Sequence, residues 1–110
     1  MIDHFNDTNC AVTICDVNGV IIYMNKKSIE TFVKDGKSLI GKNLKDCHPP
    51  KAWNKILELL QTGGSNAYSI SKNGVKKIIY QTAWKEEGKI KGLIEISMVV
   101  PEEMPHYVRG

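Results

Sequence analysis

Hydrophobic and polar residues alternate with period two at the start of the chain, a pattern typical of half-buried β-strands. In the segment AVTICDVNGVIIYMN, two apolar runs rich in β-branched residues flank Asn18-Gly19. An Asn-Gly pair suits the positive φ angles of a tight hairpin turn. The pattern therefore predicts two antiparallel strands, at about residues 11–16 and 20–25.

The middle of the chain changes to the three- and four-residue spacing of helices. Ile29, Phe32 and Val33 follow this spacing and predict a short helix, and a turn capped by Ser38 comes after it. The longest predicted helix lies in KAWNKILELLQTGG, between a Pro-Pro pair that suits a helix start and a Gly-Gly pair that suits its end. Its predicted apolar face consists of Trp53, Ile56, Leu57 and Leu60.

The last third of the chain returns to period-two alternation. The segments AYSIS, VKKIIYQTAW and LIEISMVV are separated by glycine-bearing turns and predict three more strands. Two strands, a group of helices and three further strands predict an α+β fold, with a five-stranded antiparallel sheet and helices packed on one of its faces. After the last strand, we expect Met104, His106 and Tyr107 to pack back on the domain, with contact to a partner as the alternative.

One domain accounts for residues 1–110, because a chain of this length with 42% hydrophobic residues supports one modest core. We expect an N-terminal segment at 1–10, a core at 11–100 and a C-terminal tail at 101–110. The net charge of +3 comes from lysines spread among acidic residues, which disfavours a nucleic-acid surface. The sequence has neither an apolar run long enough for a membrane span nor a secretory signal pattern. We therefore expect a soluble, cytoplasmic protein with no membrane partner.

The three cysteines, Cys10, Cys15 and Cys47, are odd in number and have no CxxC spacing. This pattern argues against a disulfide framework and against a four-ligand zinc site, so we expect reduced thiols. The chain also lacks a GxSxG elbow, a phosphate-binding glycine loop and an HExxH motif. We expect it not to be an enzyme.

Three segments of the chain, in order, resemble the PAS family of sensory domains. They are the hairpin DVNGVIIYMN ending in Asn25, the stretch SLIGKNLKDCHPP and the closing EEGKIKGLIEISM, and the resemblance covers about residues 11 to 100. It implies a sensory or protein-interaction module whose sheet and helices enclose either a pocket for a small ligand or a filled core. PAS domains commonly form homodimers and pass their signal to a partner protein, so the resemblance implies both kinds of partner.

The adjacent Cys47 and His48 raise the alternative of a haem or metal centre in a redox or gas sensor. In flavin-binding PAS domains the resemblance implies a cysteine where this chain has Leu44, and in haem-binding ones a histidine near Ile56. These departures disfavour flavin and haem, and we expect no obligatory cofactor and no metal site. The CHPP segment instead predicts a bend, with His48 bonded to a loop carbonyl and Cys47 packed beneath the long helix.

If the interior holds a ligand, the candidate lining residues come from the second strand, the helices and the fourth strand. The choice on the fourth strand rests on its hydrogen-bonding side chains, because buried hydroxyl and indole groups need partners. Period-two alternation then places Gln81 on the opposite face from Tyr80. The candidates are Ile21, Tyr23, Asn25, Phe32, Trp53, Ile56, Leu57, Tyr80, Thr82 and Trp84. The other open alternative is a pure dimerisation domain with a filled core, which associates through its sheet or its N-terminal segment.

Overall fold

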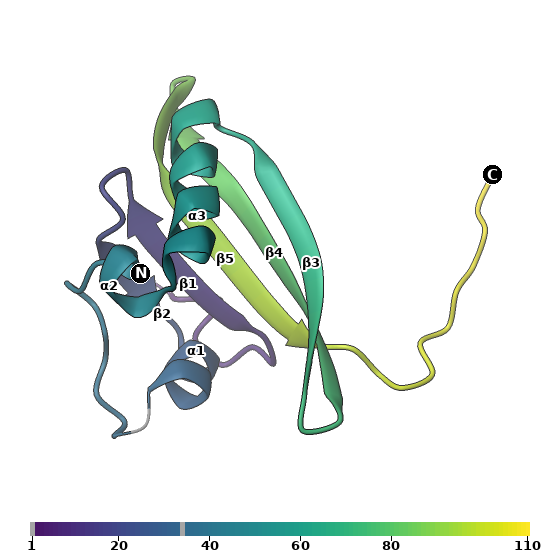
Figure 1. Cartoon of the computed structure of the whole chain (residues 1–110). Coiled ribbons are helices and arrows are strands. Elements are labelled where there is room, and N and C mark those ends of the chain that lie inside the picture. Colours follow the sequence, from purple (N-terminus) through teal and green to yellow (C-terminus); the bar gives the residue numbers. More distant parts are fainter. Residues whose placement is uncertain (1, 34) are drawn as a thin grey trace.

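A five-stranded antiparallel sheet forms the main layer of the molecule (Figure 1). The structure is a computed structural model, and it describes residues 2–33 and 35–110. The strands lie in the order β2-β1-β5-β4-β3, so that β1 and β5, from opposite ends of the chain, pair near the centre of the sheet. This arrangement confirms the predicted α+β fold. The strands are β1 (Ala11–Asp16), β2 (Ile21–Met24), β3 (Ser65–Lys72), β4 (Val75–Glu86) and β5 (Lys89–Val99).

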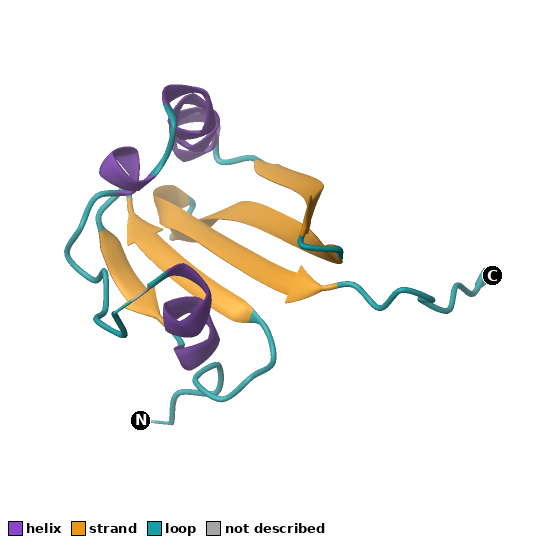
Figure 2. Cartoon of the chain, turned by 60° about the horizontal axis from the view of Figure 1, so that its bottom comes forward, coloured by secondary structure: helices purple, strands orange, loops and turns teal. Residues whose placement is uncertain are grey.

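The helices lie between β2 and β3 in the sequence, and they pack against one face of the sheet (Figure 2). They are α1 (Lys26–Phe32), α2 (Leu44–Cys47) and α3 (Pro50–Thr62). Pro50 suits the first turn of α3 because proline has no N–H to leave unpaired there. The helix ends at Gly63, whose φ of 75° is the left-handed conformation that glycine adopts without strain.

The two faces of the sheet carry different side chains. We call the covered face the helix side, and it includes Cys15, Gln81 and Leu93; their strand pairing and their contacts with α3 place them there. We call the opposite face the outer face. It carries the side chains that alternate with these, including Val12, Ile14, Ile78, Tyr80, Thr82, Trp84, Ile94, Ile96 and Met98.

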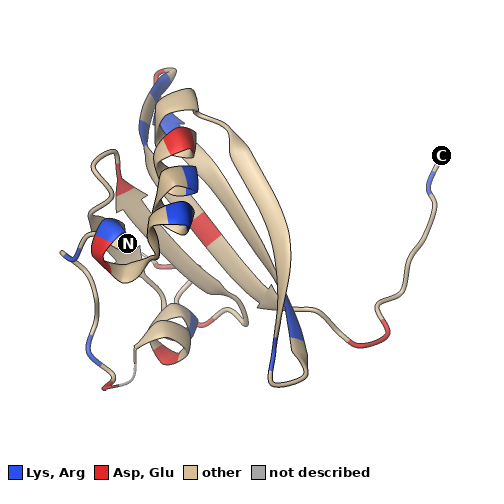
Figure 3. Ribbon diagram, viewed as in Figure 1, with Lys and Arg blue, Asp and Glu red and all other residues tan. Residues whose placement is uncertain are grey.

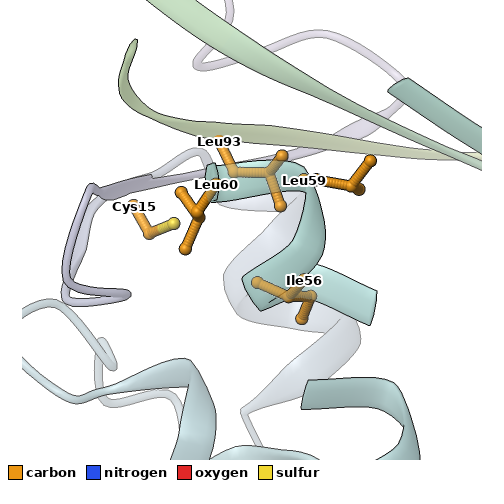
Figure 4. Packing of buried hydrophobic residues seen from close by; sticks show 5 residues of the cluster. All are labelled: Cys15, Ile56, Leu59, Leu60 and Leu93. Atoms are coloured by element: carbon orange, nitrogen blue, oxygen red, sulfur yellow. The ribbon is translucent and has the colours of Figure 1, made fainter. Parts of the chain in front are cut away.

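The hydrophobic core lies between α3 and the middle of the sheet, where Cys15, Ile56, Leu59, Leu60 and Leu93 pack together (Figure 4). The predicted apolar face of the long helix was wrong at one position. Leu57 is 36% exposed, whereas Leu59 is 3% exposed. Residues spaced i, i+3 and i+4 lie on the same face of a helix, so the face with Ile56 also carries residues 59 and 60. Position 57 lies on another face and points away from the sheet.

A close crossing of backbone and side chain explains Trp84. Its indole Nε1 donates a hydrogen bond of 3.1 Å to the carbonyl oxygen of Cys15. The two residues lie on β4 and β1, with Gly92 of β5 between them. A Cβ atom at Gly92 would collide with both the Cys15 carbonyl and the Trp84 indole. Only glycine leaves room for this bond.

The C-terminal tail departs from expectation. Residues 101–110 are all exposed and run away from the sheet (Figures 1 and 2). Met104 is 59% exposed and Tyr107 is 70% exposed, so the predicted packing of the tail on the domain was wrong. The tail has few large apolar side chains and two prolines, and the Arg109 guanidinium lies over the Tyr107 ring at 5.4 Å. Within the described part of the chain, no helix has the length and apolar character needed to cross a membrane.

Candidate functional site

A cavity of about 320 Å³ lies between the helix side of the sheet and the segments that lead from α1 to α3. We call it the helix-side cavity. Its wall is mostly apolar, with a carboxylate, a hydroxyl and an imidazole as the polar groups. A cavity of this kind has the usual composition of a small-molecule site. Its lining residues are Thr13, Ile21, Met24, Phe32, Leu39, Leu44, Cys47, His48 and Glu95.

A row of polar side chains crosses the helix side of the sheet and reaches the wall of this cavity at Glu95, while Gln81 and Asn66 lie beyond that wall. Glu95 pairs in register with Thr13 on one side and Gln81 on the other, and Gln81 pairs with Asn66. Asn66 Nδ2 donates to Gln81 Oε1 at 3.1 Å, and Gln81 Nε2 donates to Glu95 Oε2 at 2.9 Å. The bonds run in one direction, so the row ends on the carboxylate of Glu95. Gln81 is only 4% exposed, and its two bonds fix the position of that carboxylate.

Charged residues otherwise gather on helices, turns and strand ends (Figure 3). An acidic position nevertheless lies in the middle of β5, whose only acidic residue is Glu95. Glu95 is half-buried and faces the cavity with the row behind it. The site therefore combines an apolar body with one fixed negative charge.

His48 separates the cavity from a second hollow. Its Nδ1 donates a hydrogen bond of 2.8 Å to the carbonyl oxygen of Leu44, the first residue of α2, where we expected a loop carbonyl as the acceptor. In that tautomer Nε2 carries a lone pair and can accept. His48 lines both hollows. The second, which we call the α3–β3 groove, has a volume of about 610 Å³ and is lined by His48, Pro49, Lys51, Ala52, Lys55, Asn66, Tyr68 and Gln81.

Cys47 lies differently from the sequence-based expectation. It is exposed and lines the helix-side cavity, whereas we expected it beneath the long helix. Cys47 ends α2, and the chain then extends through His48 before α3 begins, which keeps the thiol outside the α3 contact. All three cysteines are free. Among the described residues, no three His, Cys, Asp or Glu side chains converge as a metal centre would require.

Of the candidate lining residues, Ile21 and Phe32 do line the helix-side cavity. Ile56 belongs to the hydrophobic core, and Trp53 packs at its edge against the hairpin at Gly19. Leu57 points away from the sheet, as described above. The structure thus gives Trp53, Ile56 and Leu57 places outside the cavity wall.

The three candidates on β4 lie on the outer face. Tyr80, Thr82 and Trp84 pair with Ile96, Ile94 and Gly92, which alternate with the helix-side residues of β5. Alternation itself was predicted correctly, but the choice of face was the reverse of the one found. Leu93 packs against α3 and fixes the face, and Ala83 pairs with Leu93. Gln81 lies on the same side, where its amide oxygen and its amide nitrogen each form a hydrogen bond.

The side chains of Tyr23 and Asn25, in and just after β2, form hydrogen bonds with the N-terminal segment. Burial and a hydrogen bond from its hydroxyl to Asp3 raise the pKa of Tyr23 to about 12. Asn25 is fully buried and forms the N-cap of α1. Its Oδ1 accepts from Val12 N and Ser28 N, and its Nδ2 donates to the Phe5 and Cys10 carbonyl oxygens.

Sequence reasoning missed Glu95, Gln81 and Asn66 as site residues. A usable signal was present in LIEISM, where a charged residue interrupts an apolar strand. The row itself could not be seen, because it depends on the pairing register of three strands.

Comparison with known proteins supplies a family. A family model described as PAS fold matches residues 5–63, which is more than half of the chain. A search of curated proteins gave no significant match.

Several solved structures have the same fold. A sensory box sensor histidine kinase from Vibrio cholerae is 19% identical with a TM-score of 0.69, and the match covers 87% of this chain and 85% of that one. A PAS domain from Colwellia psychrerythraea is 18% identical with a TM-score of 0.67, over 90% and 92% of the two chains. VqmA bound to DPO is 21% identical with a TM-score of 0.69, over 89% of this chain and 55% of that one. Another similar structure is that of the Vibrio cholerae VqmA dimer.

Proposed function

The chain belongs to the PAS family, and from this premise we propose that it is a sensory module that binds a small molecule in the helix-side cavity. Binding changes the surface or the self-association of the domain, and a partner protein detects that change. The proposal gives the domain no catalytic role.

The observation that carries this proposal is the helix-side cavity with its hydrogen-bonded polar row. A filled core would leave no cavity of about 320 Å³ against the sheet. It would also have no reason to fix a carboxylate there, since burying polar groups costs free energy unless they are paired. The walls supply apolar contact area, and the polar groups fix the orientation of a bound molecule.

Two of the similar structures support a sensory role. One is part of a sensor histidine kinase, and the other is VqmA bound to DPO. At these identities the likeness concerns the fold alone, so the ligand of this chain is not inferred from them. VqmA supplies a precedent for a ligand-bound protein that contains this fold.

Native mass spectrometry of freshly purified protein tests the proposal. We expect a co-purified small molecule, or one captured from a metabolite mixture, to add its mass to the folded domain. Replacing Ile21 by Trp should fill the cavity and abolish that added mass, whereas Ile22→Trp should not, because Ile22 is 46% exposed and outside the cavity wall. Apoprotein alone under all conditions would contradict the proposal and favour a filled interaction domain.

A second function, self-association through the outer face, is favoured by a separate observation. The outer face carries Tyr80 and Met98 at 40% and 43% exposure, beside the half-buried Ile78, Ile94 and Ile96. Such an apolar patch is typical of a protein interface. We propose that it pairs with a second copy of the domain. Sedimentation over a range of concentrations tests this, and a monomer at all concentrations would contradict it.

A further inference from the structure

We propose that the helix-side cavity binds a compact organic cation, an amine or protonated nitrogen heterocycle whose positive group pairs with Glu95. The proposal rests on the proposed function and names the class of ligand. Three features of the described residues carry it, and each concerns the environment of this one carboxylate.

The first feature is that no basic side chain of the described residues forms an ion pair with Glu95. Within residues 2–33 and 35–110, ion pairs join Lys26 to Asp7 and Lys55 to Glu58, and neither involves Glu95. Lys51 and Lys55 line the α3–β3 groove, on the other side of His48. Among the described residues that line the helix-side cavity, the only basic one is His48, whose Nδ1 donates to the Leu44 carbonyl oxygen. No lysine or arginine side chain within residues 2–33 and 35–110 forms an ion pair with Glu95.

The second feature is the hydrogen-bond row, which holds the carboxylate in place. Gln81 Nε2 donates to one carboxylate oxygen of Glu95, and Gln81 is itself held by Asn66. The row thus fixes an anionic group at the base of the cavity before any ligand arrives, which lowers the entropic cost of binding.

The third feature is the apolar wall around this charge. Ile21, Met24, Leu39 and Leu44 contribute apolar side chains, and Phe32 adds an aromatic ring. Apolar side chains around the carboxylate strengthen its pair with a bound cation, and its negative charge disfavours a bound anion. The cavity is partly open to solvent at Phe32, which is 46% exposed. The ring also offers a face for a cation. A cavity of about 320 Å³ accepts more than one ring, since roughly 150 Å³ is enough for benzene in a dry protein cavity.

Three probes of nearly equal size and different charge test the proposal: benzylamine, benzyl alcohol and benzoate. Each is titrated into ¹⁵N-labelled protein, and amide shifts of cavity residues such as Ile21 and Leu44 report where it binds. We expect benzylamine to bind more tightly than benzyl alcohol, and benzoate to bind most weakly. A charge-assisted hydrogen bond predicts a difference of roughly tenfold or more between the amine and the alcohol.

Two variants separate the charge of Glu95 from its shape. Glu95→Gln keeps the size of the side chain and an acceptor for Gln81, and we expect it to weaken benzylamine by roughly tenfold or more while leaving benzyl alcohol unchanged. Glu86→Gln removes the same charge from the exposed end of β4 and should change neither. Comparison of the three probes on the unmodified protein needs no variant and stands even if Glu95→Gln unfolds.

The outcomes also separate this proposal from the proposed function. If benzyl alcohol or benzoate binds in the cavity as tightly as benzylamine, the cation class is wrong and the binding function stands. Unchanged benzylamine affinity in Glu95→Gln would likewise overturn the role of Glu95. If no probe shifts the cavity residues and no molecule co-purifies, both proposals fail together.

Discussion

The side chain of Asn25 joins segments that are far apart in the sequence. It holds the N-terminal segment through the Phe5 and Cys10 carbonyl oxygens, and β1 through the Val12 N–H. It also caps α1 by accepting from Ser28 N. A single, fully buried side-chain amide makes all of these hydrogen bonds. The resemblance to PAS sequences pointed to this asparagine, and the structure gives it an architectural role.

We expect Asn25→Ala to lower the free energy of unfolding by about 3–5 kcal/mol, because several buried backbone groups lose their partner together. Urea unfolding followed by circular dichroism measures the effect. Asn54→Ala on the exposed side of α3 is the control and should change stability by less than about 0.5 kcal/mol. Equal effects of the two variants would show that the Asn25 network contributes little.

Cys15 makes the stability of the domain depend on pH in the alkaline range. Burial, with a smaller contribution from nearby Asp16, raises the pKa of its thiol from 9.0 to about 11. Because the folded-state pKa is the higher one, the stabilisation is fully present below about pH 9 and is lost as the pH rises toward 11. The unfolded chain releases the proton first and is favoured by it.

The loss attributable to Cys15 between pH 8 and pH 11 is roughly 2 kcal/mol. We expect Cys15→Ala to be less stable than the unmodified protein at pH 8 and to show a shallower decline toward pH 11. Cys47→Ala, which removes an exposed thiol, should keep the full decline. Urea unfolding at a series of pH values measures both. Parallel curves for Cys15→Ala and the unmodified protein would rule out this titration as the cause.

The helix α3 offers a matched pair of leucines for testing which of its faces is buried. Leu59 is 3% exposed in the core, and Leu57 is 36% exposed on the other side. We expect Leu59→Ala to cost about 2–5 kcal/mol and Leu57→Ala less than about 1 kcal/mol. Both substitutions have the same effect on helix propensity, so the difference in urea midpoint reports burial alone. A larger effect at Leu57 would show that the buried face of α3 is the one predicted from the sequence.

The order of helices and strands could be predicted from the sequence because its signals are local. The Asn18-Gly19 hairpin, the proline pair before α3 and the alternation in β5 each depend on a few neighbouring residues. The face of β4 that meets the helices could not be predicted, since the alternation of side chains is the same whichever face the helices cover. That choice is made by packing against α3, which joins residues distant in sequence.

Only those residues of the candidate site whose position follows from their own element could be predicted from the sequence. Ile21 and Phe32 are apolar residues on elements that were expected beside the interior, and they line the cavity. Glu95, Gln81 and Asn66 form a site only through strand register, which no single segment specifies. The polar side chains that looked meaningful on β4 satisfy structural needs instead, as Trp84 does with the Cys15 carbonyl.

The molecule as a whole places its two proposed binding surfaces on opposite faces of one sheet. In β5 the residues alternate between them: Glu95 and Leu93 face the helices, while Ile94, Ile96 and Met98 face outward. A shift of β5 caused by a bound molecule therefore moves side chains of the outer face as well. If the cavity ligand and the second copy of the domain each bind more tightly to one position of β5 than to another, each of them changes the affinity of the other. This coupling is reciprocal.

We expect Met98→Lys to weaken self-association by roughly tenfold or more, because it places a charge inside an apolar contact. Ile70→Lys is the matched control: it is 40% exposed, close to the 43% of Met98, but it lies on β3 beside Lys77 on the helix side. It should leave the dimer unchanged. Sedimentation equilibrium measures both, and urea unfolding checks that each variant is folded. If both variants weaken self-association equally, or if Met98→Lys does not weaken it, the outer face is not the site of pairing.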